Sequence, residues 1–156
     1  MGRRERDRLI AMIMRQYDEL EPTHAWQATP IVSLEDFFIG NDDQLSIAPN
    51  LDPHPGLDTF DQVLCSVRAR PEVHGLWLGI HESPEADEEL DADIWPTVIK
   101  VFVLTSAVAE QVEAWTAALR HSGAMEAPCM GVGGGRPWST LPAAPGGMRM
   151  VVVMWH

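Results

Sequence analysis

Apolar residues recur every three or four positions in four stretches of the chain, which is the spacing of a helix with one buried face. Ser33 is the expected N-cap of the second stretch, because a serine hydroxyl can accept a backbone N–H bond and acidic residues follow it. Gly40 and Pro71 are expected to end the second and third stretches, since these residue types stop helices. The predicted helices cover residues 4–17, 34–39, 57–70 and 107–121.

Shorter apolar runs between these helices predict strands. In the second run, Leu76, Leu78 and Ile80 alternate with Trp77 and His81, so the two sets should point to opposite faces of a sheet. The third run is apolar at nearly every position, which is typical of a strand that is buried on both faces. The predicted strands cover residues 44–48, 73–82, 97–105 and 148–155.

The order of these elements predicts an α+β fold. From residue 44 onward the order is β-α-β-β-α-β, the ferredoxin-like arrangement of a four-stranded antiparallel sheet with two helices on one face. The 156 residues fit a single domain, with an extra N-terminal helix and loop at 1–30, an α+β core at 31–156 and an irregular Gly- and Pro-rich excursion at 122–147. The face under the helices is expected to carry Leu45, Ile47, Leu76, Leu78, Ile80, Ile99, Val101, Val103, Val151 and Val153.

The other face of the predicted sheet is also apolar. An exposed patch of this kind normally marks a contact, so we expect it to be a ligand-binding or interface face. It could be covered by the N-terminal helix, by the 122–147 excursion or by a second copy of the chain, and face-to-face pairing would give a homodimer. Val152 belongs to this face, and its candidate site residues are Trp77, His81, Phe102, Leu104, Met150 and Met154.

Several stretches of the chain are similar to known sequences. They read "FFIGNDDQLSIAPNLDPHPGLDTFDQVL", "RARPEV", "VFVLTSA" and "VEAW". With them, residues 30–120 and the terminal strand resemble a group of small uncharacterised bacterial α+β proteins that have no assigned function. The resemblance implies a stable, recurring domain. It implies no activity and no catalytic residue.

The charge of the chain is strongly acidic and unevenly distributed. Residues 1–16 hold five arginines and two acids, a local charge of +3, so a net charge of −12 leaves −15 for the rest. A body this acidic repels phosphate backbones, which argues against nucleic-acid binding outside the N-terminal segment. It attracts a basic protein surface instead and accelerates the encounter.

A run of acids between residues 82 and 93 falls in the connection between two predicted strands. Such a run is usually a solvated loop. The alternative is an acidic decoy that faces a basic partner. The candidate partner-binding residues in this loop are Asp87, Glu88, Glu89 and Asp91.

The most site-like polar cluster is Asn41, Asp42 and Asp43, which follows the predicted helix stop at Gly40. These residue types favour turns, and the alternating ligand spacing of a calcium loop is absent, so we predict a turn and no metal site. His54 lies between two prolines near Asp52 and could act as a base. No catalytic, cofactor-binding or metal-binding residue is assigned.

Cysteine usage and hydropathy point to a cytoplasmic protein. Cys65 and Cys129 are far apart and lack a CxxC neighbour, which argues against a disulfide framework and fits a reducing compartment. The apolar run in the N-terminal helix is too short for a signal peptide, and no stretch approaches the length of a membrane span. We therefore expect no membrane association.

Three functions remain open from the sequence. The leading hypothesis is a non-enzymatic, acidic, cytoplasmic domain that binds a basic protein, in the manner of an inhibitor or an immunity protein. The first alternative is a small-molecule-binding protein or cofactor-independent enzyme that uses the second sheet face. The second is a structural or assembly role. A deep pocket at His81 would favour the first alternative, whereas an acidic surface would favour protein binding.

Overall fold

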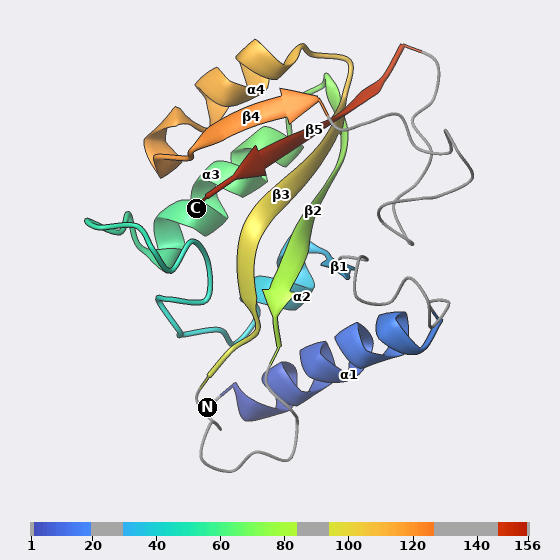
Figure 1. The fold of residues 1–156 in the computed structure, drawn as a ribbon, viewed down its shortest axis with the longest axis vertical. Coiled ribbons are helices and arrows are strands. Elements are labelled where there is room, and N and C mark those ends of the chain that lie inside the picture. The colour runs from blue at the N-terminus through green and yellow to red at the C-terminus, as the bar shows by residue number, and fades with distance from the viewer. Residues whose placement is uncertain (1, 20–29, 84–93, 127–146, 156) are drawn as a thin grey trace.

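A computed structural model describes residues 2–19, 30–83, 94–126 and 147–155 (Figure 1). All four predicted helices are present in it. Ser33 caps the second helix as expected, because its Oγ accepts a hydrogen bond from the Asp36 backbone N–H at 3.1 Å. The four helices are α1 (Arg3–Glu19), α2 (Leu34–Phe38), α3 (Leu57–Arg68) and α4 (Ala109–Trp115).

The fourth helix ends earlier than its apolar pattern predicts. The Thr116 hydroxyl donates to the Val112 carbonyl at 2.9 Å, and the chain then tightens into a 3-10 turn, η2 (Ala117–Leu119). Arg120 follows with a positive φ of 55°, which reverses the chain direction. A bond from a threonine side chain to the preceding turn competes with the regular helix, which accounts for the early end.

In the described part of the chain, the sheet has five antiparallel strands in the order β1-β2-β3-β5-β4. The predicted strands at 73–82, 97–105 and 148–155 are confirmed as the three central strands. The strands are β1 (Ile31–Val32), β2 (Val73–Glu82), β3 (Thr97–Thr105), β4 (Gly123–Glu126) and β5 (Arg149–Met154).

The predicted ferredoxin-like topology and its count of four strands are wrong. Residues 44–48 do not form a strand, because Ile47 makes only an isolated parallel bridge to Val98. Ala48 then takes a positive φ of 49° and turns the chain away. The place beside β3 that the ferredoxin-like fold would give to this segment is taken by β5. Two strands that the sequence did not indicate, β1 and β4, form the edges.

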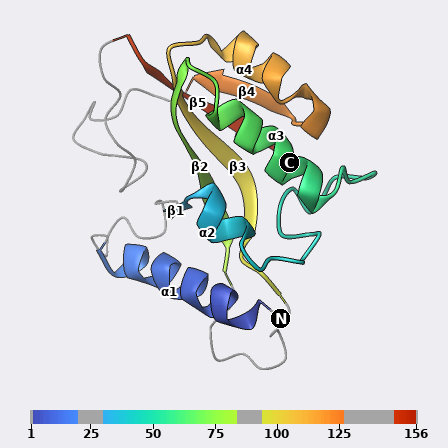
Figure 2. The same ribbon diagram turned by 180° about the vertical axis from the view of Figure 1, so that it is seen from behind.

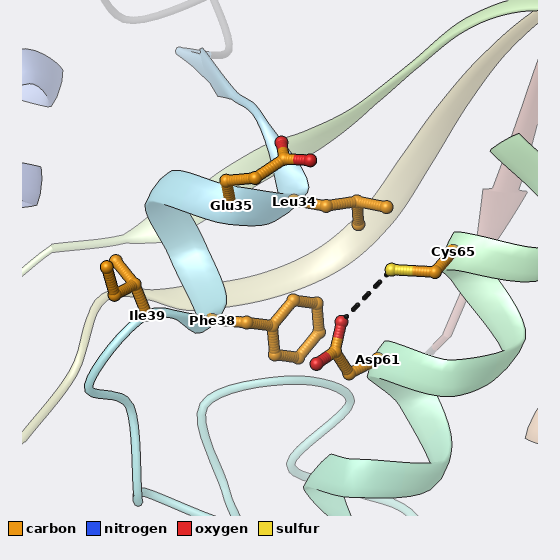
Figure 3. Close-up of a pocket in the computed structure, with 6 residues that line it drawn as sticks. All are labelled: Leu34, Glu35, Phe38, Ile39, Asp61 and Cys65. Carbon is orange, nitrogen blue, oxygen red and sulfur yellow. Dashed lines mark hydrogen bonds between the residues drawn. The ribbon is translucent and has the colours of Figure 1, made fainter.

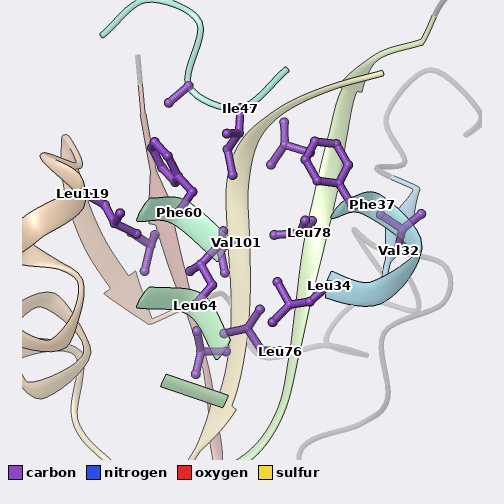
Figure 4. Close-up of a cluster of buried hydrophobic side chains, with 14 of the residues drawn as sticks. Val32, Leu34, Phe37, Ile47, Phe60, Leu64, Leu76, Leu78, Val101 and Leu119 are labelled. Atoms are coloured by element: carbon purple, nitrogen blue, oxygen red, sulfur yellow. The ribbon is translucent and has the colours of Figure 1, made fainter. Parts of the chain in front are cut away.

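The helices cover one face of the sheet, as predicted. Figure 2 shows α3 and α4 in front of β2, β3 and β5, and Figure 4 shows the apolar side chains between these layers. Two expected members of this core are absent from it. Leu45 is 57% exposed because it lies in a turn. Val98 takes the place expected for Ile99, because the register between β2 and β3 shifts by one residue there and reverses the alternation.

The N-terminal helix lies across the end of the sheet, beside α2, rather than over its second face (Figure 1). Leu9 and Ile13 belong to the same cluster as the residues under α3. Arg6 is buried in this contact, and its Nε donates to the Ile94 carbonyl at 2.6 Å. Within the described ranges, no helix combines the length and the apolar character needed to cross a bilayer.

Candidate binding pocket between α2 and α3

The strand register brings most of the predicted second-face residues together. Phe102 pairs with Trp77 on one side and with Val152 on the other, and Leu104 pairs with Met150. These side chains form a second hydrophobic cluster, but the face is not open to solvent. Phe102 is fully buried, and Leu104, Met150 and Val152 are nearly so. A role for this face in ligand or subunit binding therefore stays a prediction.

His81 is not brought into the same place as Trp77. The Trp77 indole packs against the backbone of Gly75. A Cβ atom placed on Gly75 would clash with the ring carbons of Trp77, so only glycine leaves room for the indole there. His81 lies further along β2, at a register irregularity where it has no paired residue on β3, and its side chain is exposed. A small-molecule site at His81 therefore stays a prediction. Met154 is half-buried at the rim of the cluster.

The acidic candidates Asp87, Glu88, Glu89 and Asp91 lie outside the described residues.

The polar cluster before the isolated bridge is a turn, as predicted. The Asn41 side-chain oxygen accepts a hydrogen bond from the Asp43 backbone N–H at 2.9 Å. One carboxylate oxygen of Asp43 accepts a hydrogen bond from the Leu45 backbone N–H at 3.0 Å. The other Asp43 oxygen accepts the Trp95 N–H at 3.2 Å, which ties the turn to the start of β3. Among the residues that the structure describes, no group of three or more His, Cys, Asp or Glu is placed to hold a metal ion.

His54 has a structural role. Its Nδ1 accepts the Gly56 backbone N–H at 2.9 Å, and its Nε2 lies 2.7 Å from the Ile47 carbonyl. The carbonyl can only accept, so Nε2 carries the proton. Both ring nitrogens are therefore engaged with the backbone, and neither is available to act as the base that the sequence suggested.

A pocket lies between α2 and α3, in a place that the sequence did not indicate (Figure 3). The end of α2 supplies an apolar wall, and the Phe38 side chain points toward α3. Asp61 and Cys65 are one helical turn apart on α3 and face this wall. The volume is about 300 Å³, and the pocket is lined by Leu34, Glu35, Phe38, Ile39, Asp61 and Cys65.

The two carboxylates at the pocket have different partners. Glu35 forms an ion pair with Arg68, which joins α2 to α3. This hydrogen bond lowers the pKa of Glu35 below its ordinary value and raises the pKa of Arg68. The Glu35 pair is therefore present at neutral pH and is lost as the pH falls through that lowered pKa. Asp61 accepts only the Cys65 thiol, at 3.3 Å, and has no ion-pair partner among the described residues.

These contacts decide what the pocket can do chemically. Burial raises the pKa of the Cys65 thiol, and the hydrogen bond to Asp61 raises it further. The reactive form of cysteine is the thiolate, so a protonated thiol beside a carboxylate is a poor nucleophile. Glu35 is held ionised by its arginine. The pocket thus offers an apolar wall and one carboxylate, Asp61, that forms no ion pair among the described residues, which suits binding rather than catalysis.

A sequence model of a known protein family matches almost the whole chain. The model of the YfbO family, described as an uncharacterised protein family, covers residues 4–153. The chain belongs to the uncharacterised protein YfbO family. This confirms the resemblance to small uncharacterised proteins. No curated protein and no solved structure matches the chain.

The thiol chemistry of this YfbO-family pocket can be tested directly. We expect Cys65 to react slowly with iodoacetamide at mildly alkaline pH, because its raised pKa leaves little thiolate. Asp61→Asn removes the negative neighbour and should make alkylation about two- to fivefold faster. Peptide-resolved mass spectrometry separates Cys65 from Cys129. Asp58→Asn, an exposed change one turn earlier on α3, should leave the rate unaltered, and equal acceleration by both variants would contradict this assignment.

Proposed function

We propose that this YfbO-family protein is a binding protein whose α2–α3 pocket takes up a lysine or arginine side chain of a basic protein partner. The observation that carries the proposal is the position of Asp61. Its carboxylate faces an apolar wall and forms no ion pair among the described residues, whereas the nearby Glu35 is paired with Arg68. Arg68 also attracts Asp61, but its main interaction is with Glu35. A carboxylate in such a place favours a partner that brings its own positive charge.

The shape of the pocket agrees with this chemistry. Lysine and arginine carry an apolar stem below a charged head, so the stem can lie along Phe38 and Ile39 while the head reaches Asp61. A volume of about 300 Å³ is at the lower end of the range for ligand pockets. It suits one long side chain better than a large organic cofactor.

The charge of the whole chain supports the same partner. A net charge of −12 draws a basic protein toward the surface and lowers the chance of nucleic acid as the ligand. The long-range part of this attraction should weaken as salt rises, because the Debye length shortens from about 10 Å at 0.1 M to about 3 Å at 1 M.

The proposal predicts binding of a short, end-blocked peptide of alternating arginine and leucine, measured by isothermal titration calorimetry. Asp61→Asn keeps the shape and removes the charge, and we expect it to weaken the affinity about tenfold, because it removes a charge-assisted contact. A peptide with glutamate in place of arginine should not bind.

The matched control is Asp58→Asn, which removes the same charge from an exposed position on α3 outside the pocket. It should change the affinity less than about twofold, as expected of a rim charge. If both variants lose the same affinity, the peptide responds only to the overall charge of the protein, and the pocket proposal fails.

A further inference from the structure

The solvent face of α1 is a stripe of arginines on a chain that is otherwise acidic. Leu9 and Ile13 are buried on one side of the helix. At about 100° per residue, Arg4, Arg8 and Arg15 fall within roughly 40° of one another on the opposite side. All three side chains are exposed. We call these three residues the arginine stripe.

The arginine stripe borders the pocket. Arg8 Nη2 lies 3.7 Å from Asp36 Oδ1, and Asp36 is on α2, next to the pocket residue Glu35. Figure 2 shows α1 and α2 as neighbours at the same end of the molecule. A basic surface and a pocket that favours a basic side chain therefore lie side by side, but on one chain the stripe points to solvent.

We propose that a second copy of this chain occupies the pocket, with the arginine stripe of each copy docked on the α2–α3 pocket of the other. A two-fold axis beside α1 and α2 makes both contacts at once, since each copy gives its stripe and receives its partner's. Arg4 or Arg15 enters the pocket, because Arg8 already pairs with Asp36. This inference rests on the proposed function, since it uses the same pocket.

The overall charge does not prevent this contact. Two chains of −12 repel one another at long range, but at physiological salt the Debye length is about 8 Å, so charges at the contact dominate. The contact sets the local +3 of residues 1–16 against Asp61, which forms no ion pair among the described residues. The pairing is reciprocal, so every substitution acts twice in the dimer.

Sedimentation velocity of the full chain over a range of micromolar concentrations tests this inference. The wild-type chain should dimerise, and its dissociation constant should rise with salt. R4E/R15E and Asp61→Lys should each raise that constant at least about tenfold, because each sets like charges against one another at both contacts. An equimolar mixture of the two variants should form a heterodimer, because the glutamates of one variant then face the introduced lysine of the other, while Asp61 of the first faces native arginines.

Arg3→Glu is the charge control, since Arg3 is exposed on α1 but lies about 100° away from Arg4. It should change the dissociation constant by less than about threefold. Far-UV circular dichroism confirms that each variant folds. A monomeric wild-type chain, an equal effect of Arg3→Glu, or a mixture that stays monomeric would overturn the dimer. Peptide binding by R4E/R15E, which keeps the pocket intact, tests the proposed function independently of this result.

Discussion

Phe102→Ala should lower the free energy of unfolding by about 3–5 kcal/mol, the usual loss when a buried phenylalanine leaves a cavity. The side chain is fully buried on the second face of the sheet, between Trp77 on β2 and Val152 on β5. Total stabilities of small domains are about 5–15 kcal/mol, so this loss would be a large part of the whole. Equilibrium unfolding in urea, followed by far-UV circular dichroism, measures it.

The control for this prediction is Met125→Ala on the edge strand β4. Met125 is 58% exposed, so its truncation should change stability by less than about 0.5 kcal/mol. A similarly small effect of Phe102→Ala would mean that the second sheet face is an open surface in solution. That outcome would restore this face, with Trp77 and Met154, as the leading ligand or subunit interface.

Trp155→Ala should destabilise the protein about as much as Phe102→Ala, lowering the free energy of unfolding by about 3–5 kcal/mol. The indole is nearly fully buried, its centroid lies 5.5 Å from that of the Phe60 ring, and its Nε1 donates to the Leu119 carbonyl at 2.9 Å. It thus joins the end of the chain to α3 and to η2. The same urea titration measures the effect.

Trp155→Phe separates the two contributions of this residue. It keeps an aromatic ring against Phe60 but removes the hydrogen bond and leaves the Leu119 carbonyl without its donor, which should cost about 1–3 kcal/mol. A loss as large as that of Trp155→Ala would show that the smaller ring does not pack in this site. No loss in either variant would contradict the packing of the terminal residues described above.

The elements that the sequence predicted correctly have strong internal patterns. The helices have apolar faces at helical spacing, and the central strands β2, β3 and β5 have long apolar runs. The edge strands have no such signal. β1 has two residues, and its Ile31 N–H and carbonyl are both bonded by the Gln16 side chain from α1, a contact between distant parts of the sequence. A strand that depends on this tertiary contact cannot be predicted from the local sequence pattern.

The error in topology has a local cause. Leu45 and Ile47 alternate with polar or small residues in the way of a strand, but the turn bonds of Asn41 and Asp43 fix the chain just before them. The positive φ of Ala48 then ends the extended segment after a single bridge. Alternation over so few residues cannot outweigh side-chain bonds to the backbone before the segment and a change of backbone direction after it.

The candidate pocket was only partly visible in the sequence. Asp61, Cys65 and Arg68 recur at helical spacing on α3, so their shared face could have been found. The opposite wall could not, because Leu34 and Phe38 belong to a separate helix whose packing against α3 depends on tertiary contacts such as the Glu35–Arg68 ion pair. The acidic balance of the chain predicts a basic partner but indicates no residues for a binding site.

A titration of ¹⁵N-labelled protein with the arginine–leucine peptide, followed by amide chemical shifts, shows whether the α2–α3 pocket binds a basic side chain. We expect saturable shifts that are largest at Phe38, Ile39, Asp61 and Cys65 and that shrink in Asp61→Asn. Shifts spread over exposed acids elsewhere, such as Glu110 and Glu113 on α4, with no saturation at the pocket, would contradict it.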